Sequence, residues 1–330
     1  MNATPARFLF RLAAGPRVGF GHLMRCRALA RALRVRPLVS IRGGAGARRT
    51  ARALGCDLAG RDALSHITLL IVDDPSPRHA RAWLLRAKRA GRASATIHDL
   101  GIGSRAADLI VDGSITTRSP RGAAAGLCGP RFAVLDPRVV HARARRRRRG
   151  APRRPRVLIA LGGGAHGFSV VQPLVGDIAR RCPGVRIEVA AGFSRHRRPS
   201  IGSARWIERQ DGLARDLAES DVAVVGGGVT LYEACAIGVP AVAISVVPTQ
   251  RVAIEAVAAR RAAIDAGALS DREAAVSRAG AAVAGLLRDG SARRHGSSAG
   301  RHLVDGRGAF RIAARFRVLA RAAARRNSRG

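Results

Sequence analysis

The segment that most constrains the fold is Val222–Gln250, which reads VAVVGGGVTLYEACAIGVPAVAISVVPTQ. It has the pattern of an apolar strand, a glycine turn, a helix and a second apolar strand, which is the repeating unit of a parallel α/β sheet. The three glycines Gly226–Gly228 permit a sharp turn and leave room for a ligand beside the backbone. Because a helix N-terminus offers unpaired N–H groups and the positive end of its dipole, we expect a phosphate to bind here.

Two polar residues of this helix admit two interpretations. Thr230 is expected to open the helix, and Glu233 follows three residues later on the same face. The carboxylate of Glu233 is suited to accept hydrogen bonds from sugar hydroxyls. The same spacing also fits a capping box, in which Thr230 and Glu233 would bond each other's backbone N–H groups. The local sequence leaves both interpretations open.

Similar strand and helix patterns alternate along most of the chain, which predicts parallel, doubly wound sheets. In the N-terminal half the expected strands are 8–12, 37–41, 67–72, 95–98, 109–111 and 132–135, and the expected helices are 22–33, 50–54 and 78–90. Further along, the expected strands are 157–160, 186–190, 204–207, 222–225 and 241–246, and the expected helices include 170–181 and 309–325.

The chain is long enough for two α/β domains. We expect a first Rossmann-like domain over 1–142, a basic Pro/Arg linker over 143–155, and a second Rossmann-like domain over 156–330 that includes the last helix. A cleft between the domains would hold the ligand at the carboxyl ends of the strands. The last helix carries Ile312, Phe316, Leu319 and Ala323 on one stripe, which favours docking on the protein, while its basic face leaves peripheral membrane contact as an alternative.

Composition argues against a specific nucleic-acid partner despite a formal net charge of +37. The 59 basic residues include one lysine, Lys88, so arginine replaces lysine almost everywhere, as codon bias in a GC-rich genome would produce. Aromatic residues make up 3% of the chain, which leaves little surface on which bases could stack. The dense basic run at 143–149 is interpreted as a solvated linker.

No metal, cofactor or disulfide is expected. The five cysteines are scattered without a CxxC pair, which favours reduced thiols in the cytoplasm. No apolar run approaches the ~20 residues of a membrane span. The carboxylates Asp73 and Asp74 are interpreted as a helix cap or loop anchor rather than as a metal-binding pair. The other histidines singled out have no ligand spacing and are expected to be structural or exposed: His98, His141, His166 and His196.

A second glycine-rich turn lies near the N-terminus, where Arg17–Cys26 reads RVGFGHLMRC. Gly19 and Gly21 lead into a helix that places His22 at its N-terminus. The positive end of the helix dipole disfavours the imidazolium, and a neutral imidazole can act as a general base toward water. The alternative is that His22 caps the helix or bonds the loop.

The sequence RVGFGHLMRCRALARAL resembles the N-terminal signature of the UDP-sugar hydrolases of pseudaminic acid biosynthesis and of their spore-coat polysaccharide relatives. These enzymes are similar in fold to the glycosyltransferase that makes lipid II from lipid I. Further segments resemble the family in the same order: IVDD, IHDLG, DLIVDGS, FAVLDP, VLIALGGG, GGGVTLYEACAIGVPAVAI, VPTQ and DGRGAFRIA.

The resemblance implies a two-domain fold of the GT-B type that holds UDP mainly in the C-terminal domain. Position by position, Gly227, Gly228 and Thr230 would face the diphosphate and Glu233 the ribose hydroxyls. It also implies that Gln250 contacts the sugar or phosphate, and that His22 activates water. The remaining positions assigned to nucleotide or substrate binding are Gly19, Gly21, Gly162 and Gly163.

The activity implied by the resemblance is hydrolysis of a UDP-sugar to UDP and a free amino-sugar, in nonulosonic-acid or surface-polysaccharide biosynthesis. The chain departs from the family at Ala13, Gly15, Val229 and Thr249, which lie on the sugar side more than on the UDP side. Two alternatives therefore stay open. One is a GT-B glycosyltransferase with a UDP-sugar donor, and the other is a nucleotide-binding protein without turnover.

Overall fold

A computed structural model describes residues 7–16, 18–98, 106–116, 125–150, 154–162, 167–192, 200–209 and 211–327. The chain divides into two compact units. The first unit combines Met1–Pro137 with Arg307–Gly330, and the second unit is Arg138–Gly306. Each unit is built around its own parallel sheet.

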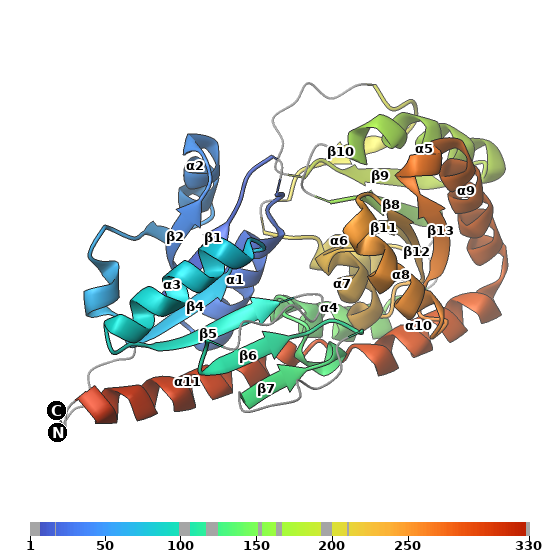
Figure 1. The fold of residues 1–330 in the computed structure, drawn as a ribbon. Helices are drawn as coiled ribbons and strands as arrows, with labels where there is room; N and C mark the ends of the chain where they lie inside the picture. Colours follow the sequence, from blue (N-terminus) through green and yellow to red (C-terminus); the bar gives the residue numbers. More distant parts are fainter. Residues whose placement is uncertain are drawn as a thin grey trace. The chain divides into compact units, whose positions relative to one another are not determined.

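The first unit contains a seven-stranded parallel sheet of order β3-β2-β1-β4-β5-β6-β7 (Figure 1). Its strands are β1 Phe8–Ala13, β2 Leu38–Arg42, β3 Asp57–Leu58, β4 Leu69–Asp73, β5 Ala93–His98, β6 Leu109–Asp112 and β7 Ala125–Cys128. Its α-helices are α1 Gly21–Leu33, α2 Ala45–Ala53, α3 Pro77–Arg89 and α11 Gly308–Asn327, and its 3-10 turns are η1 Ala63–His66 and η2 Pro130–Phe132.

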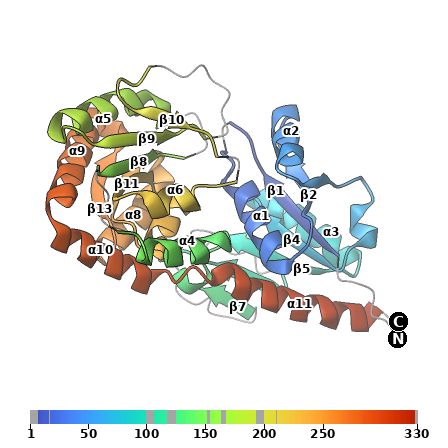
Figure 2. The same ribbon diagram turned by 180° about the vertical axis from the view of Figure 1, so that it is seen from behind.

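Helices cover both faces of this sheet. In Figure 1, α3 lies in front of the strands, whereas α1 lies in front of them in Figure 2, which shows the unit from behind. The central strands β1 and β4 are buried along their whole length, as continuous apolar runs between two helical layers require. The strand order reverses between β1 and β4, which makes their carboxyl ends the switch point of this unit.

The second unit contains a six-stranded parallel sheet of order β10-β9-β8-β11-β12-β13. Its strands are β8 Arg156–Ala160, β9 Arg186–Ala190, β10 Arg205–Ile207, β11 Val222–Gly226, β12 Ala241–Ser245 and β13 Ile264–Ala268. Its helices are α4 Arg138–Arg147, α5 Phe168–Arg181, α6 Ala214–Glu219, α7 Val229–Ile237, α8 Arg251–Ala258, α9 Arg272–Arg288 and α10 Gly290–Leu303, with 3-10 turns η4 Pro248–Gln250 and η5 Leu269–Asp271.

The core of the second unit joins the sheet to α5 and α9, which pack against each other. Apolar side chains of α5 such as Leu174 and Ile178 are fully buried there against strand residues such as Val224. On the other side, α7 packs against α4, α6 and α10. The strand order reverses between β8 and β11, so this unit has its own switch point beside the glycines Gly226–Gly228.

Most predicted elements are confirmed to within a few residues, but the predicted strand 132–135 is wrong. That segment is buried because the chain packs tightly around it. A Cβ at Gly113 would lie 2.6 Å from Ala133 Cα, and one at Gly308 would lie 2.8 Å from Phe132 C. The edge strand beside β6 is instead β7.

The predicted domain boundaries differ from the two units. The expected linker 143–155 begins as helix, because α4 extends to Arg147. Arg146 also donates a hydrogen bond of 2.8 Å to Gly238 O of the same unit. The last helix, α11, belongs to the first unit, where it contacts α1. Arg317 donates to Ala32 O and Leu33 O at the end of α1.

The apolar stripe of α11 docks on the protein, as predicted. Ile312, Phe316 and Ala323 are buried and Leu319 is partly buried. Arginines occupy much of the remaining surface of the helix.

None of the helices in the described parts of the chain combines the length and the apolar composition that crossing a bilayer requires.

Candidate functional site

The switch point of the first unit brings together His22 and Asp73. Asp73 is the last residue of β4, and His22 is the second residue of α1, which follows the neighbouring strand β1. The Nδ1 atom of His22 lies 2.8 Å from Oδ1 of Asp73. The side chain of Asp73 is 5% exposed and that of His22 is 15% exposed, so the carboxylate is buried while the imidazole reaches the surface.

Arg25 completes this cluster from one turn further along α1. It donates from Nε to Asp73 Oδ2 at 2.9 Å and from Nη2 to Oδ1 at 2.7 Å, which is a two-pronged guanidinium–carboxylate contact. Although burial disfavours a charged carboxylate, Arg25 and then His22 hold the pKa of Asp73 well below its ordinary value. Asp73 is therefore ionised at neutral pH.

The ionised carboxylate of Asp73 determines which ring nitrogen of His22 carries the proton. Nδ1 of His22 lies 2.7 Å from Arg25 Nη2 as well as 2.8 Å from Asp73, so it can accept from the one or donate to the other. Because the ionised carboxylate of Asp73 can only accept, and a hydrogen bond to a charged acceptor is the stronger kind, we assign the proton to Nδ1, which donates it to Oδ1. This tautomer leaves Nε2 with the lone pair that a general base needs.

The glycine loop before α1 positions the imidazole. Gly15 and Gly19 close the loop with two backbone hydrogen bonds, of 3.1 and 2.7 Å, and Gly19 has a φ of +79° that favours glycine. Gly21 is exposed and begins α1. The N-cap residue is Phe20, without a side-chain cap, so the interpretation of His22 as a helix cap is wrong.

The two adjacent carboxylates have different partners. Asp74 accepts from Arg42 Nε at 2.9 Å and from the backbone N–H of Ser76 at 3.0 Å, so its predicted role as a loop anchor is confirmed. For Asp73 the same prediction is wrong, because its partners are His22 and Arg25. Within the described residues, no group of three or more His, Cys, Asp or Glu side chains could hold a metal ion.

The hydrogen bonds that join His22, Arg25 and Asp73 involve none of the other residues singled out from the sequence. His141 is exposed, and His98 is partly buried at the end of β5. His166 and His196 lie outside the described residues. All five cysteines are free in the structure, and burial raises the pKa of Cys235 to about 12.

At the second unit's switch point, α7 begins directly after the three glycines. Its N-cap residue is Gly228, which has no side chain to cap the helix, and Thr230 and Glu233 lie inside the helix. The capping-box interpretation is therefore wrong, because Thr230 is the second helical residue. Thr230 and Glu233 are both partly buried. The first-turn N–H groups of α7 thus receive no side-chain cap from Gly228 and remain suited to an anion.

The three glycines have three different reasons to be glycine. A Cβ at Gly226 would lie 3.0 Å from Leu161 O, and one at Gly227 would lie 2.8 Å from both Gln250 Cβ and Ile254 Cγ1. Gly228 is exposed, and a Cβ there would meet only Gln250 Nε2, at 4.0 Å. Gly226 and Gly227 are thus packing positions, and Gly228 is the one that leaves open space.

Gln250 holds this turn in place. Its Oε1 accepts from Gly227 N at 3.2 Å and from Val246 N at 2.9 Å. Because both partners are donors, the atom that faces them must be the amide oxygen. The amide nitrogen consequently lies on the side of Gly228, where it can donate to a bound anion.

The neighbouring strand β8 ends at the same switch point. Gly162 follows it in an exposed position with a φ of +116°, a conformation that favours glycine. Gly163, the other predicted binding residue of this loop, lies outside the described residues.

Sequence comparison gives no relative, since the chain matches no family model and no curated protein. Solved structures with the same fold do match. MurG of Acinetobacter baumannii is 13% identical with a TM-score of 0.60, over 93% of this chain and 98% of MurG. The spinosyn forosaminyltransferase SpnP is 16% identical with a TM-score of 0.64, over 96% and 100%. The spinosyn rhamnosyltransferase SpnG, solved with thymidine diphosphate, is 17% identical with a TM-score of 0.62, over 95% and 99%.

The chain has the GT-B fold. The neighbours cover nearly all of it, and both parallel sheets take part in the match. At these identities the likeness establishes the fold alone, which confirms the fold class expected from the sequence.

Proposed function

We propose that the chain is a nucleotide-sugar hydrolase in which His22, oriented by Asp73, activates water. The observation that carries the proposal is the 2.8 Å contact between His22 Nδ1 and the buried carboxylate of Asp73. A histidine whose Nδ1–H is held by a carboxylate has a fixed tautomer and orientation, and its developing positive charge is stabilised as it takes a proton. The resemblance of the N-terminal signature to UDP-sugar hydrolases supports the same assignment.

In the proposed reaction, Nε2 of His22 takes a proton from water while the water oxygen bonds to the anomeric carbon. The bond between that carbon and the diphosphate oxygen breaks, and its electron pair leaves with UDP. The N-terminus of α7 at Gly228 and the amide nitrogen of Gln250 would stabilise the charge on the departing diphosphate. Thr230 would add a hydroxyl in the first turn, and Glu233 would accept from the ribose hydroxyls.

The second candidate is a glycosyltransferase, in which the same base takes its proton from an acceptor hydroxyl. The structural neighbours SpnP, a forosaminyltransferase, and SpnG, a rhamnosyltransferase, are named for glycosyl transfer and favour this candidate. With all five cysteines free, either enzyme is proposed to work in the reducing cytoplasm, on the pathway to a nonulosonic acid or a surface polysaccharide.

The proposal is tested by incubating the protein with a panel of UDP- and TDP-sugars without acceptor and measuring nucleotide release. Release from one UDP-amino-sugar with water alone is the expected result. Release that requires an added acceptor would replace hydrolysis by glycosyl transfer. Nucleotide binding by calorimetry without turnover under either condition would leave the non-catalytic binding protein as the correct interpretation.

Two neighbouring glycine substitutions should separate folding from ligand binding. We expect Gly228→Ala to fold with wild-type stability, because its φ of −94° suits any residue and its Cβ meets open space, but to bind UDP about tenfold or more weakly because a methyl group occupies the anion's position. Gly227→Ala should instead lower the free energy of unfolding by roughly 1–3 kcal/mol through overpacking. Thermal unfolding and calorimetry check both. Equal UDP affinity in Gly228→Ala and wild type would contradict the assigned site.

The amide of Gln250 offers a test that preserves the fold. In Gln250→Glu a carboxylate oxygen can still accept from Gly227 and Val246, but the donor beside Gly228 becomes a second anionic oxygen. We expect a small change in melting temperature and a loss of UDP affinity on the order of 10- to 100-fold, from the lost donor and the added repulsion. Unchanged affinity would show that Gln250 serves the turn alone.

A further inference from the structure

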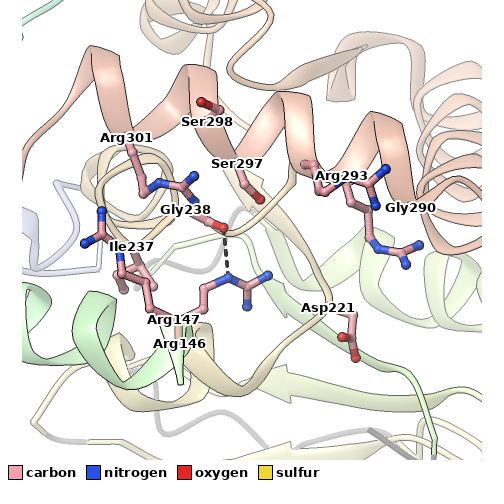
Figure 3. A pocket seen from close by; sticks show the side chains of 11 residues that line it. Arg146, Arg147, Asp221, Ile237, Gly238, Gly290, Arg293, Ser297, Ser298 and Arg301 are labelled. Atoms are coloured by element: carbon pink, nitrogen blue, oxygen red, sulfur yellow. Dashed lines mark hydrogen bonds between the residues drawn. The ribbon is translucent and has the colours of Figure 1, made fainter. Parts of the chain in front are cut away.

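A pocket of about 530 Å³ in the second unit lies among α4, α7 and α10 (Figure 3). Its charged lining consists of five arginines and one carboxylate: Arg146, Arg147, Arg293, Arg294, Arg301 and Asp221. It adjoins Gly238 at the C-terminal end of α7, whereas the proposed nucleotide site lies at the N-terminal end. A nine-residue helix places these ends about 13 Å apart. The pocket is therefore separate from the proposed nucleotide site.

Part of the charged lining is already used by the fold. Arg146 donates to Gly238 O at 2.8 Å, and Arg293 donates to Leu287 O at 2.6 Å. Asp221, the carboxylate of the pocket, accepts from Arg149 at 3.2 Å and from the backbone N–H of Arg156 at 2.8 Å. These groups form the walls and leave the pocket strongly positive.

Three lining arginines have no such partner in the described structure. The guanidinium groups of Arg147, Arg294 and Arg301 make no hydrogen bond or ion pair with any residue that the structure describes. Arg294 and Arg301 lie seven residues apart on α10 with Ser297 between them, so they share one face of that helix. Arg301 also lies against Gly238, where a Cβ would approach its Nη1 to 2.5 Å.

This concentration differs from the general abundance of arginine in the chain. Several other arginines of the second unit face carboxylates, as Arg205 does with Glu188 at 2.5 Å and Arg209 with Asp216 at 2.9 Å. In the pocket, by contrast, burial and then the charge of Arg147 lower the pKa of Arg301. The pocket thus gathers five arginines around one lining carboxylate, Asp221, with Asp289 as a further carboxylate close enough to interact with Arg293 and Arg294.

We propose that this pocket is a second ligand site, which binds a phosphate-bearing polyanion through Arg147, Arg294 and Arg301. Planar guanidinium groups bind phosphate oxygens in pairs, and three of them from two helices can surround a diphosphate-sized group. The Ser297 hydroxyl, on the face of α10 toward Arg146 and Gly238 in Figure 3, adds a neutral donor. A soluble phosphate ester and the phosphate headgroup of a lipid share this chemistry.

The test compares two charge-matched double variants in calorimetric titrations with inorganic pyrophosphate. R294Q/R301Q removes two pocket charges, while R52Q/R272Q removes two exposed charges from α2 and α9. We expect the pocket variant to bind on the order of 10- to 100-fold more weakly than wild type, because two charge-assisted contacts are lost, and the control to bind like wild type. Repeating the comparison in a Gly228→Ala background reduces the contribution of pyrophosphate bound at the proposed nucleotide site, so a difference that persists there belongs to the pocket.

Because Arg301 packs against Gly238, R147Q/R294Q serves as a second pocket variant whose two side chains are exposed. Co-sedimentation with phosphatidylglycerol vesicles, with phosphatidylcholine vesicles as the control, then distinguishes a lipid headgroup from a soluble phosphate ester as the ligand. Vesicle binding lost in both pocket variants but kept in the control indicates a lipid headgroup, and pyrophosphate binding alone indicates a soluble ligand. Equal losses in the pocket and control variants, or no binding of either probe by wild type, would overturn the proposal.

Discussion

Replacing His22 with alanine is expected to lower the rate of UDP-sugar turnover by about 10²–10⁴-fold, the usual contribution of a positioned general base. Binding of UDP should persist, because the predicted nucleotide contacts belong to the second unit, at Gly228 and Gln250. Nucleotide release and calorimetric UDP affinity, measured on the same preparation, check the two halves of this prediction.

The matched control is His79→Ala, which removes an exposed histidine of α3 in the same unit. It should retain wild-type turnover. If His22→Ala also turned over at the wild-type rate, the base would have to be another group. A parallel loss of UDP affinity in His22→Ala would show that His22 supports binding rather than proton transfer.

Replacing Asp73 with asparagine should impair both catalysis and stability. An amide cannot hold the Nδ1 proton of His22 as a carboxylate does, so we expect turnover to fall by about 10²–10⁴-fold. The buried guanidinium of Arg25 also loses its counter-charge, which lowers the free energy of unfolding by on the order of 3 kcal/mol. Urea denaturation and nucleotide release give the two values.

The adjacent carboxylate supplies the control for Asp73. Asp74→Asn breaks the contact with Arg42, which is partly exposed, and should cost stability while leaving turnover near the wild-type level. A comparable loss of turnover in Asp74→Asn would indicate that Asp73 acts only through the stability of this loop.

The depressed pKa of Asp73 also predicts how stability depends on pH. Burial opposes the shift, but Arg25 and His22 outweigh it, so the folded-state pKa lies below the ordinary value of 3.8. The contribution of the ionised carboxylate is complete above that value and is lost as the pH falls from it toward the folded-state pKa. Urea denaturation of wild type and Asp73→Asn from about pH 6 to about pH 3 should show a steeper decline for wild type.

The sequence located the sheets well because buried parallel strands are continuous apolar runs. It missed the strands β3 and β13 as well as β7, whose sequence AGLC is short and rich in small residues, and it mistook the buried segment 132–135 for a strand. An apolar segment is expected to be buried, but it need not be a strand. Segment 132–135 is buried because the chain packs closely against it at glycines such as Gly113.

The candidate site was predictable only where its residues share a local pattern. Gly228 follows its strand by two residues and His22 follows β1 by nine through a glycine loop, so a strand–glycine–helix pattern indicates both. Asp73 lies 51 residues from His22 along the chain, and their contact depends on β1 and β4 being neighbours in the sheet. That strand order is a property of the whole domain, which no local pattern contains.

The most direct test of the proposed hydrolysis is to run the reaction in H₂¹⁸O and weigh both products by mass spectrometry. If water deprotonated by His22 attacks the anomeric carbon, the free sugar should carry one ¹⁸O atom and the UDP none, and both products should form about 10²–10⁴-fold more slowly in His22→Ala. The heavy isotope in UDP would place the attack at phosphorus, and no product without an acceptor sugar would contradict hydrolysis itself.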